Sequence, residues 1–260
     1  MRTLTFGYSP CPNDTFAFHA LTFGLVEAPF RIEPILLDIE ELNRRAHDGA
    51  FDLTKLSVGA FAGVGDRYRL LRSGAALGHG VGPLVVAREP ISLEQATRGR
   101  LAIPGRETTA YRLLRLAAPS LGTLVEMRYD RILRAVADGD ADAGLIIHES
   151  RFTYAEHGLH RVIDLGAWWE ADTGLPVPLA GICARHDLDW QLAQAAETTI
   201  RQSVQYAFDH PEASRDYVRA HAQEMSAEVC AQHIALYVNS HSLDIGEMGM
   251  QAIQRLLDAA

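Results

Sequence analysis

The sequence predicts an α/β fold that is divided into two lobes. Strand-like and helix-like segments alternate through the first half of the 260-residue chain, which predicts a largely parallel sheet. After Leu188 the pattern changes to nearly continuous helix. Two short extended segments, residues 85–90 and 181–186, bracket the middle of the chain and are interpreted as crossings between the lobes.

The two crossings predict a discontinuous first lobe, residues 1–87 plus 184–260, and an inserted second lobe, residues 88–183. A pair of crossing strands makes a hinge, and ligands bind in the cleft between lobes that are joined in this way. We therefore expect the functional residues to gather at that cleft.

Seven segments have the length and composition of strands, because apolar or β-branched residues run between turn-forming residues. These predicted strands are residues 4–8, 31–37, 53–57, 83–87, 101–104, 124–128 and 143–147.

Helical periodicity separates the predicted strands. In residues 131–138 the apolar Ile132, Leu133 and Val136 lie on one face, and Gly139 follows as a stop. No signal of an active site is visible after Leu188, so the C-terminal helices are expected to be structural. The predicted helices are residues 14–23, 39–48, 58–63, 109–116, 131–138, 188–208, 211–222, 227–238 and 245–257.

Composition restricts the class of protein. The formal net charge of -9 argues against nucleic acid or an anionic membrane as the partner. No apolar run approaches the ~18 residues of a membrane span, and no secretory signal precedes the first predicted strand. Cys11, Cys183 and Cys230 are widely spaced without a metal-ligand pattern, so we expect reduced thiols in a cytoplasmic protein.

Residues 143–154 are the most informative segment, because an apolar run of strand length is followed by His148 at its carboxyl end. Ligands of open α/β sheets bind at such ends, and histidine, with an ordinary pKa of ~6.5, is suited to proton transfer at neutral pH. A histidine that merely caps the strand is the alternative. Glu149 follows at once, but alternation along a strand would point it away from His148.

Residues 53–57 end a strand with polar groups. Alternation places Lys55 and Ser57 on one face and Leu56 on the other. Lys55 is the only lysine among 24 basic residues, and its ammonium group could hold a carboxylate or polarise a carbonyl. An edge-strand lysine in solvent is the alternative.

Two strand-to-helix turns carry further candidates. Thr108 and Thr109 open a predicted helix, where Thr108 can cap while nearby hydroxyls and amides bind a carboxylate. Ser9 and Asn13 lie in the turn after the first strand and are candidate contacts to a ligand. Asn13 and Asp14 are also natural N-cap residues, and for these two capping is the favoured interpretation.

Familiar motifs are absent from the sequence. The glycine-rich residues 78–83 precede a strand and no helix follows, so they do not predict a dinucleotide site. Phe152 stands where a zinc motif that begins at His148 would need its second histidine. The residues favour a carboxylated small-molecule ligand, proton transfer by His148, and no metal.

Five stretches together resemble the 1,4-dihydroxy-6-naphthoate synthase family of the futalosine pathway of menaquinone biosynthesis. The resemblance implies a type 2 periplasmic-binding-protein-like fold, with two α/β lobes joined by two hinge strands and a cleft between them. The stretches are SPCPNDTF at 9–16, KLS at 55–57, GHGVGPL at 78–84, IPGRETTA at 103–110 and HESRFTY at 148–154.

The resemblance also implies a reaction, the lyase cleavage of cyclic dehypoxanthinyl futalosine to 1,4-dihydroxy-6-naphthoate with release of dihydroxyacetone. The family's general base falls on His148. Its substrate-binding stretches fall on Lys55, Leu56 and Ser57 and on Thr108 and Thr109. Because aromatisation drives such a cleavage, no cofactor is expected.

Two other functions stay open at this point. One is a cytoplasmic binding protein of the same fold that releases a small carboxylate unchanged, since fold alone does not give function. The other is the sister enzyme of the pathway, which dehydrates a chorismate-derived substrate, although HESRFTY favours the naphthoate synthases. The sequence leaves a homodimer open as well.

Overall fold

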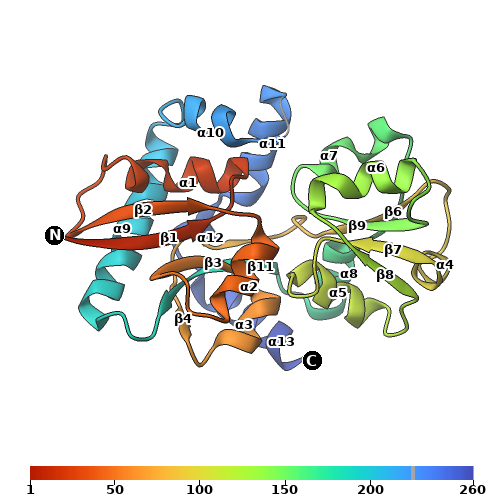
Figure 1. Cartoon of the computed structure of the whole chain (residues 1–260), viewed down its shortest axis with the longest axis horizontal. Helices are drawn as coiled ribbons and strands as arrows, with labels where there is room; N and C mark the ends of the chain where they lie inside the picture. The colour runs from red at the N-terminus through yellow and green to blue at the C-terminus, as the bar shows by residue number, and fades with distance from the viewer. Residues whose placement is uncertain (224–225, 260) are drawn as a thin grey trace.

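A computed structural model describes residues 1–223 and 226–259 as two α/β lobes, each built on its own sheet (Figure 1). In the sheet of the first lobe the strand order is β2-β1-β3-β11-β4, and β5 pairs with the other end of β11. β1 runs parallel to β2 and β3, whereas β11 runs antiparallel to β3. The bounds are β1 (Arg2–Tyr8), β2 (Phe30–Leu36), β3 (Leu53–Ser57), β4 (Tyr68–Leu70), β5 (Ala76–Gly78) and β11 (Val177–Arg185).

The second sheet has the order β10-β6-β9-β7-β8. Here β7 is parallel to β8 and β9, and β6 is antiparallel to β9 and β10. The bounds are β6 (Leu84–Ala87), β7 (Arg100–Ile103), β8 (Thr123–Glu126), β9 (Ala143–Ile146) and β10 (His160–Asp164).

Both sheets are therefore mixed, and the expectation of a largely parallel sheet is wrong. Parallel pairing is confined to the βα units, and the strands next to the crossings between lobes run the other way. The crossings also come earlier than the predicted boundaries at residues 87/88 and 183/184. β6 already belongs to the second sheet and all of β11 to the first, because each forms its ladder there.

Nine helices agree with the sequence prediction to within a few residues. They are α1 (Pro12–Thr22), α2 (Ile39–Ala46), α3 (Val58–Val64), α5 (Thr109–Ala117), α6 (Ile132–Ala137), α9 (Trp190–Asp209), α10 (Arg215–His221), α11 (Ala227–Tyr237) and α13 (Gly246–Asp258). Strands β4, β5 and β10 are not among the predicted strands, and of β11 only the extended segment 181–186 was predicted. Several helices, most of them short, are also not among the predicted ones. These are α4 (Leu93–Arg98), α7 (Ser150–Thr153), α8 (Leu165–Thr173), α12 (Ser240–Leu243), η1 (Tyr129–Arg131) and η2 (Tyr154–His157).

The core of the first lobe lies between its sheet and the C-terminal helices. The rings of Phe6 and Tyr8 of β1 pack against Phe18 of α1, with centroids 5.1 and 5.4 Å from that of Phe18. α9, α10 and α11 cover α1 and complete this core (Figure 1). Burying side chains of this size stabilises the fold by ~1.5–3 kcal/mol each, so α1 and the turn before it are firmly held.

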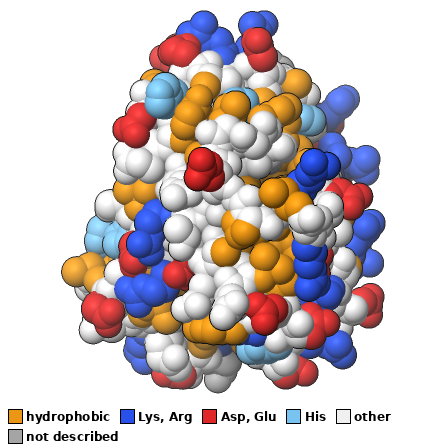
Figure 2. All heavy atoms as spheres, turned by 90° about the vertical axis from the view of Figure 1, so that its left-hand side faces the viewer, with side chains coloured by type: hydrophobic (Ala, Val, Ile, Leu, Met, Phe, Trp, Pro, Cys, Tyr) orange, Lys and Arg blue, Asp and Glu red, His pale blue; other side chains and the backbone are white. Residues whose placement is uncertain are grey.

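At the outer end of the first lobe, the surface has no single dominant charge (Figure 2). Figure 2 shows the end of the first lobe, where acidic and basic side chains are interspersed with hydrophobic ones. Within the described part of the chain, no helix is both long and apolar enough to cross a membrane.

Candidate active site

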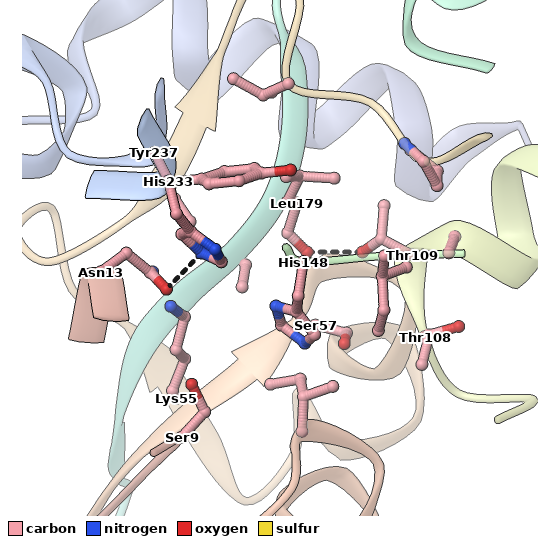
Figure 3. Close-up of a pocket in the computed structure, with 17 residues that line it drawn as sticks. Ser9, Asn13, Lys55, Ser57, Thr108, Thr109, His148, Leu179, His233 and Tyr237 are labelled. Carbon is pink, nitrogen blue, oxygen red and sulfur yellow. Dashed lines mark hydrogen bonds between the residues drawn. The ribbon is translucent and has the colours of Figure 1, made fainter. Parts of the chain in front are cut away.

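A cavity lies between the lobes, and both lobes and helix α11 contribute to its wall (Figure 3). Polar side chains from the first lobe, the second lobe and α11 all reach this wall, and apolar side chains lie between them (Figure 3). The lining residues are Ser9, Asn13, Ile39, Lys55, Ser57, Ala76, Val81, Pro83, Thr108, Thr109, Ala110, Ile147, His148, Leu179, Ala180, His233 and Tyr237.

His148 lies two residues beyond the end of β9, in a turn, and lines the cavity as predicted. Its φ of 57° makes it the one non-glycine residue with positive φ among the residues described. Such a conformation is strained and clusters at functional sites. Nε2 is buried and has no hydrogen-bond partner within residues 1–223 and 226–259.

The imidazole of His148 is neutral at physiological pH. Burial lowers its pKa to about 3, and the nearby positive charge of Lys55 lowers it in the same direction. A neutral ring with an unpartnered nitrogen can accept a proton from a ligand.

Lys55 lines the cavity, but its ammonium group already has a partner inside the protein. It forms a buried ion pair with Asp14. The same carboxylate accepts hydrogen bonds from Ser9 N at 3.1 Å, from Ser9 Oγ at 2.6 Å and from Asn13 Nδ2 at 2.8 Å. Because β3 lies between β1 and β11, a solvated edge lysine is excluded.

The capping prediction for Asn13 and Asp14 is wrong. Helix α1 begins at Pro12 with Cys11 as its N-cap residue, so both side chains belong to the first turn. Proline suits this first position because it has no N–H to satisfy. Asn13 is instead free to line the cavity, and Asp14 holds Lys55.

Thr108 and Thr109 both line the cavity, yet both hydroxyls are engaged within the chain. Thr108 Oγ1 accepts from Tyr111 N at 3.1 Å, which confirms its role as the cap of α5. Thr109 Oγ1 donates to Leu179 O at 2.6 Å and accepts from Gly59 N at 3.0 Å. The first-turn amides of α5 have no intrahelical acceptors, and they offer an anion a partner at this wall.

The predicted alternation along β3 is confirmed. Ser57 lines the cavity, and its Oγ accepts from Asn43 Nδ2 at 3.0 Å. Leu56 lies on the opposite face, where it packs against Val64 and Tyr68 in a buried cluster. Its side chain is not among those that line the cavity.

Side-chain contacts also join the two lobes, next to the cavity-lining residues Ile39 and Thr108. Glu40 of α2 reaches the turn before α5, where its Oε1 accepts from Glu107 N at 3.3 Å. Gly105 in that turn has a φ of 150°, and a Cβ there would lie 2.1 Å from the Glu40 carboxyl carbon. Burial raises the pKa of Glu40 to about 7. His47 Nε2 lies 2.9 Å from Glu107 Oε1 and adds a second contact between the lobes.

The sequence analysis missed two site residues, His233 and Tyr237 of α11. The expectation that the C-terminal helices are only structural is wrong for this helix. Their spacing of four residues places them on one helix face, and that polar pair on a packed helix was the available signal. Burial keeps the pKa of His233 well below its usual range, and the neighbouring His148 and Lys55 shift this pKa in the same direction.

The cysteines and acidic residues show no sign of a metal site. All three cysteines are buried, and no disulfide joins them in the described part of the chain. Within the described residues no group of three or more His, Cys, Asp or Glu side chains is placed to hold a metal ion.

Comparison with known proteins finds relatives over the full chain. A family model described as menaquinone biosynthesis matches residues 4–260. A curated protein of Thermus thermophilus named 1,4-dihydroxy-6-naphtoate synthase is 58% identical, over 100% of this chain and 94% of its own length. A Streptomyces coelicolor protein of the same name is 46% identical, over 99% of this chain and 93% of its own length.

Solved structures agree with these matches and confirm the fold. A structural-genomics protein of Archaeoglobus fulgidus superposes with a TM-score of 0.94 at 37% identity, covering 99% of this chain and 96% of its own. A Candida albicans gene product, described as exhibiting the generic periplasmic binding protein fold, superposes with a TM-score of 0.72 at 15% identity. That match covers 99% of this chain and 90% of the other, and it supports the fold alone. The expected periplasmic-binding-protein-like fold with two α/β lobes is confirmed.

Proposed function

This chain belongs to the family of 1,4-dihydroxy-6-naphthoate synthases of menaquinone biosynthesis, and from that premise we propose its reaction and its catalytic base. Cyclic dehypoxanthinyl futalosine is cleaved to 1,4-dihydroxy-6-naphthoate and dihydroxyacetone, in the cytoplasm, with His148 as general base. The observation that carries this proposal is the unpartnered, buried Nε2 of a neutral His148 at the wall of the cavity.

The proposed cleavage follows the pattern of a retro-aldol reaction. His148 takes the proton of a hydroxyl on the sugar-derived part of the substrate. The electrons of the O–H bond form the carbonyl of the released ketone while the carbon–carbon bond breaks, and the ring system accepts the bonding pair and becomes aromatic. A positioned base contributes ~10²–10⁴-fold to such a step, which suits a reaction with a large driving force of its own.

The substrate carboxylate would bind at the first turn of α5. Free amides at Thr109 and Ala110 and the positive end of the helix dipole favour an anion there. Lys55 is paired with Asp14, so it would attract the substrate carboxylate through its electric field and through the N–H groups that do not bind Asp14. Ser9, Asn13 and Ser57 line the same cavity and would contact the polar sugar-derived part.

The state of His148 favours an enzyme over a binding protein of the same fold. A receptor needs complementary polar groups for its ligand, and it does not need a strained residue whose nitrogen is left without a partner. The names of the relatives at 58% and 46% identity also favour an enzyme.

The first experiment is mass spectrometry of the purified protein mixed with cyclic dehypoxanthinyl futalosine, with and without EDTA. We expect 1,4-dihydroxy-6-naphthoate and dihydroxyacetone in equal amounts, unaffected by the chelator. Unchanged substrate that remains bound to folded protein would favour a binding function and refute the proposed reaction.

A further inference from the structure

His233 connects the two lobes behind His148. It sits on α11, which packs against α1 of the first lobe, and it is almost fully buried at the cavity wall. Neither the sequence motifs nor the family resemblance points to it.

The hydrogen bonds of His233 settle which nitrogen carries its proton. The carboxylate of Asp14 can only accept, so Asn13 must turn its amide nitrogen toward Asp14, at 2.8 Å. The amide oxygen of Asn13 therefore faces His233 Nε2, at 3.0 Å, and Nε2 donates. Nδ1 of the neutral ring then carries the lone pair.

That lone pair points at the second lobe. Glu149 Oε2 lies 3.7 Å from His233 Nδ1, and Glu149 Oε1 accepts from the hydroxyl of Tyr129 at 3.3 Å. At 3.7 Å the two atoms are too far apart for a hydrogen bond, so His233 meets Glu149 as a packing neighbour. The hydrogen bond from Tyr129 orients the Glu149 carboxylate on one side, and the buried His233 ring limits its movement on the other.

The same two residues also flank His148. The Tyr129 ring meets the His148 ring edge-on, with centroids 4.6 Å apart and an interplanar angle of 63°. His233 stacks on His148 at 12°, with centroids 6.2 Å apart. Because Glu149 follows His148 in the chain, fixing Glu149 also fixes the strained turn in which His148 has its φ of 57°.

We propose that His233 is a positioning residue for His148, acting through Glu149 and through ring stacking; this rests on the proposed function of His148. Without His233 the turn would relax, water would reach the imidazole, and the His148 ring would lose its fixed orientation at the cavity wall. The titratable and charged groups that face this pair are Lys55 of β3, Tyr129 of η1, Glu149 and Tyr237.

The test compares His233→Ala and His233→Gln with the control His160→Gln, a substitution at the exposed first residue of β10. Misplacement of a reacting group by about 1 Å can cost ~10²-fold, so we expect kcat of His233→Ala to fall about 100-fold while KM changes less than about threefold. The Gln variant keeps a donor for Asn13 but loses the ring that packs beside Glu149, so its kcat should recover only in part. Wild-type kcat in both His233 variants would overturn the proposal.

A second readout does not depend on turnover. Nitrogen-15 NMR of the histidine rings follows the protonation of His148 as the pH falls. Burial keeps its pKa low in the wild type, so a relaxed, hydrated His148 in His233→Gln should protonate at a higher pH. The pH below which kcat/KM falls should also be higher in His233→Gln than in the wild type.

The two readouts separate the two proposals. If the wild type does not cleave the substrate, the proposed function fails, and the NMR titration still tests His233. If the wild type cleaves it while His148 titrates identically in wild type and His233→Gln, only the positioning role fails. If His233→Ala does not fold, kcat and the NMR titration of His233→Gln together test the positioning role.

Discussion

The carboxylate of Asp14 forms a buried ion pair with the ammonium group of Lys55 at the wall of the cavity, and the two side chains are only 2% and 6% exposed. This pair explains how the one lysine of the chain can be buried at the wall of the cavity. It also places a fixed dipole near His148, whose pKa the positive end lowers.

Breaking this pair should be costly. Asp14→Asn leaves a buried ammonium group without its counter-charge, and the free energy of unfolding should fall by ~3–5 kcal/mol, as measured by urea denaturation. The double variant Asp14→Asn with Lys55→Met removes the stranded charge and should regain most of that loss. Equal stability of the single and double variants would show that Asp14 is not the main partner of Lys55.

Removing the proposed base should separate binding from turnover. We expect His148→Ala to lower kcat by at least ~10²-fold, the low end of the contribution of a positioned base. The substrate dissociation constant, measured by calorimetry under conditions without turnover, should change little. Turnover at the wild-type rate in this variant would eliminate His148 as the base.

Thr109 should affect binding through the contacts between the lobes. Thr109→Val removes the hydroxyl that joins Gly59 N and Leu179 O. Each such bond contributes ~1 kcal/mol net, so losing both should weaken the joined arrangement of the lobes by ~2 kcal/mol and raise the substrate dissociation constant by up to about 30-fold. Thr109→Ser keeps the hydroxyl and serves as the control; a Val variant that binds as tightly as the Ser variant would contradict this role.

Glu40 should make stability depend on pH. Its pKa is raised from its usual value of 4.5 to about 7 by burial, so the folded state holds this proton more tightly than the unfolded chain. The resulting stabilisation is complete below pH 4.5 and is lost as the pH rises through 7. Glu40→Gln should therefore match the wild type at pH 5 and be the more stable of the two at pH 8. If the free energies of unfolding of the wild type and Glu40→Gln differ by the same amount at pH 5 and pH 8, the raised pKa of Glu40 is refuted.

The sequence predicted those parts of the site that follow strands. His148, Lys55, Ser57, Thr108 and Thr109 all follow or end apolar segments, and the topology of an α/β sheet brings such ends together. The sequence predicts Asn13 and Ser9 as well, but it places the cap of α1 too late, because Pro12 occupies the first helical position and Cys11 is the N-cap residue.

Residues that reach the site only through tertiary packing could not be predicted in this way. His233 and Tyr237 lie on a helix whose periodicity is that of any packed helix, and only the docking of α11 against α1 turns them toward the cavity. Strands as short as β4 and β5 carry too few residues for alternation to show, and they are defined by their pairing with β11.

The position of β11 has a consequence for synthesis of the chain. This strand lies between β3 and β4, so neither strand can pair with β11 until residues 177–185 have been synthesised. On the ribosome the strands of the second lobe, residues 84–164, emerge complete while the first sheet still exposes an open edge at β3. We expect the inserted lobe to fold first and the cavity to form only after α11 has emerged, so that nascent chains arrested before that point expose apolar surface to chaperones.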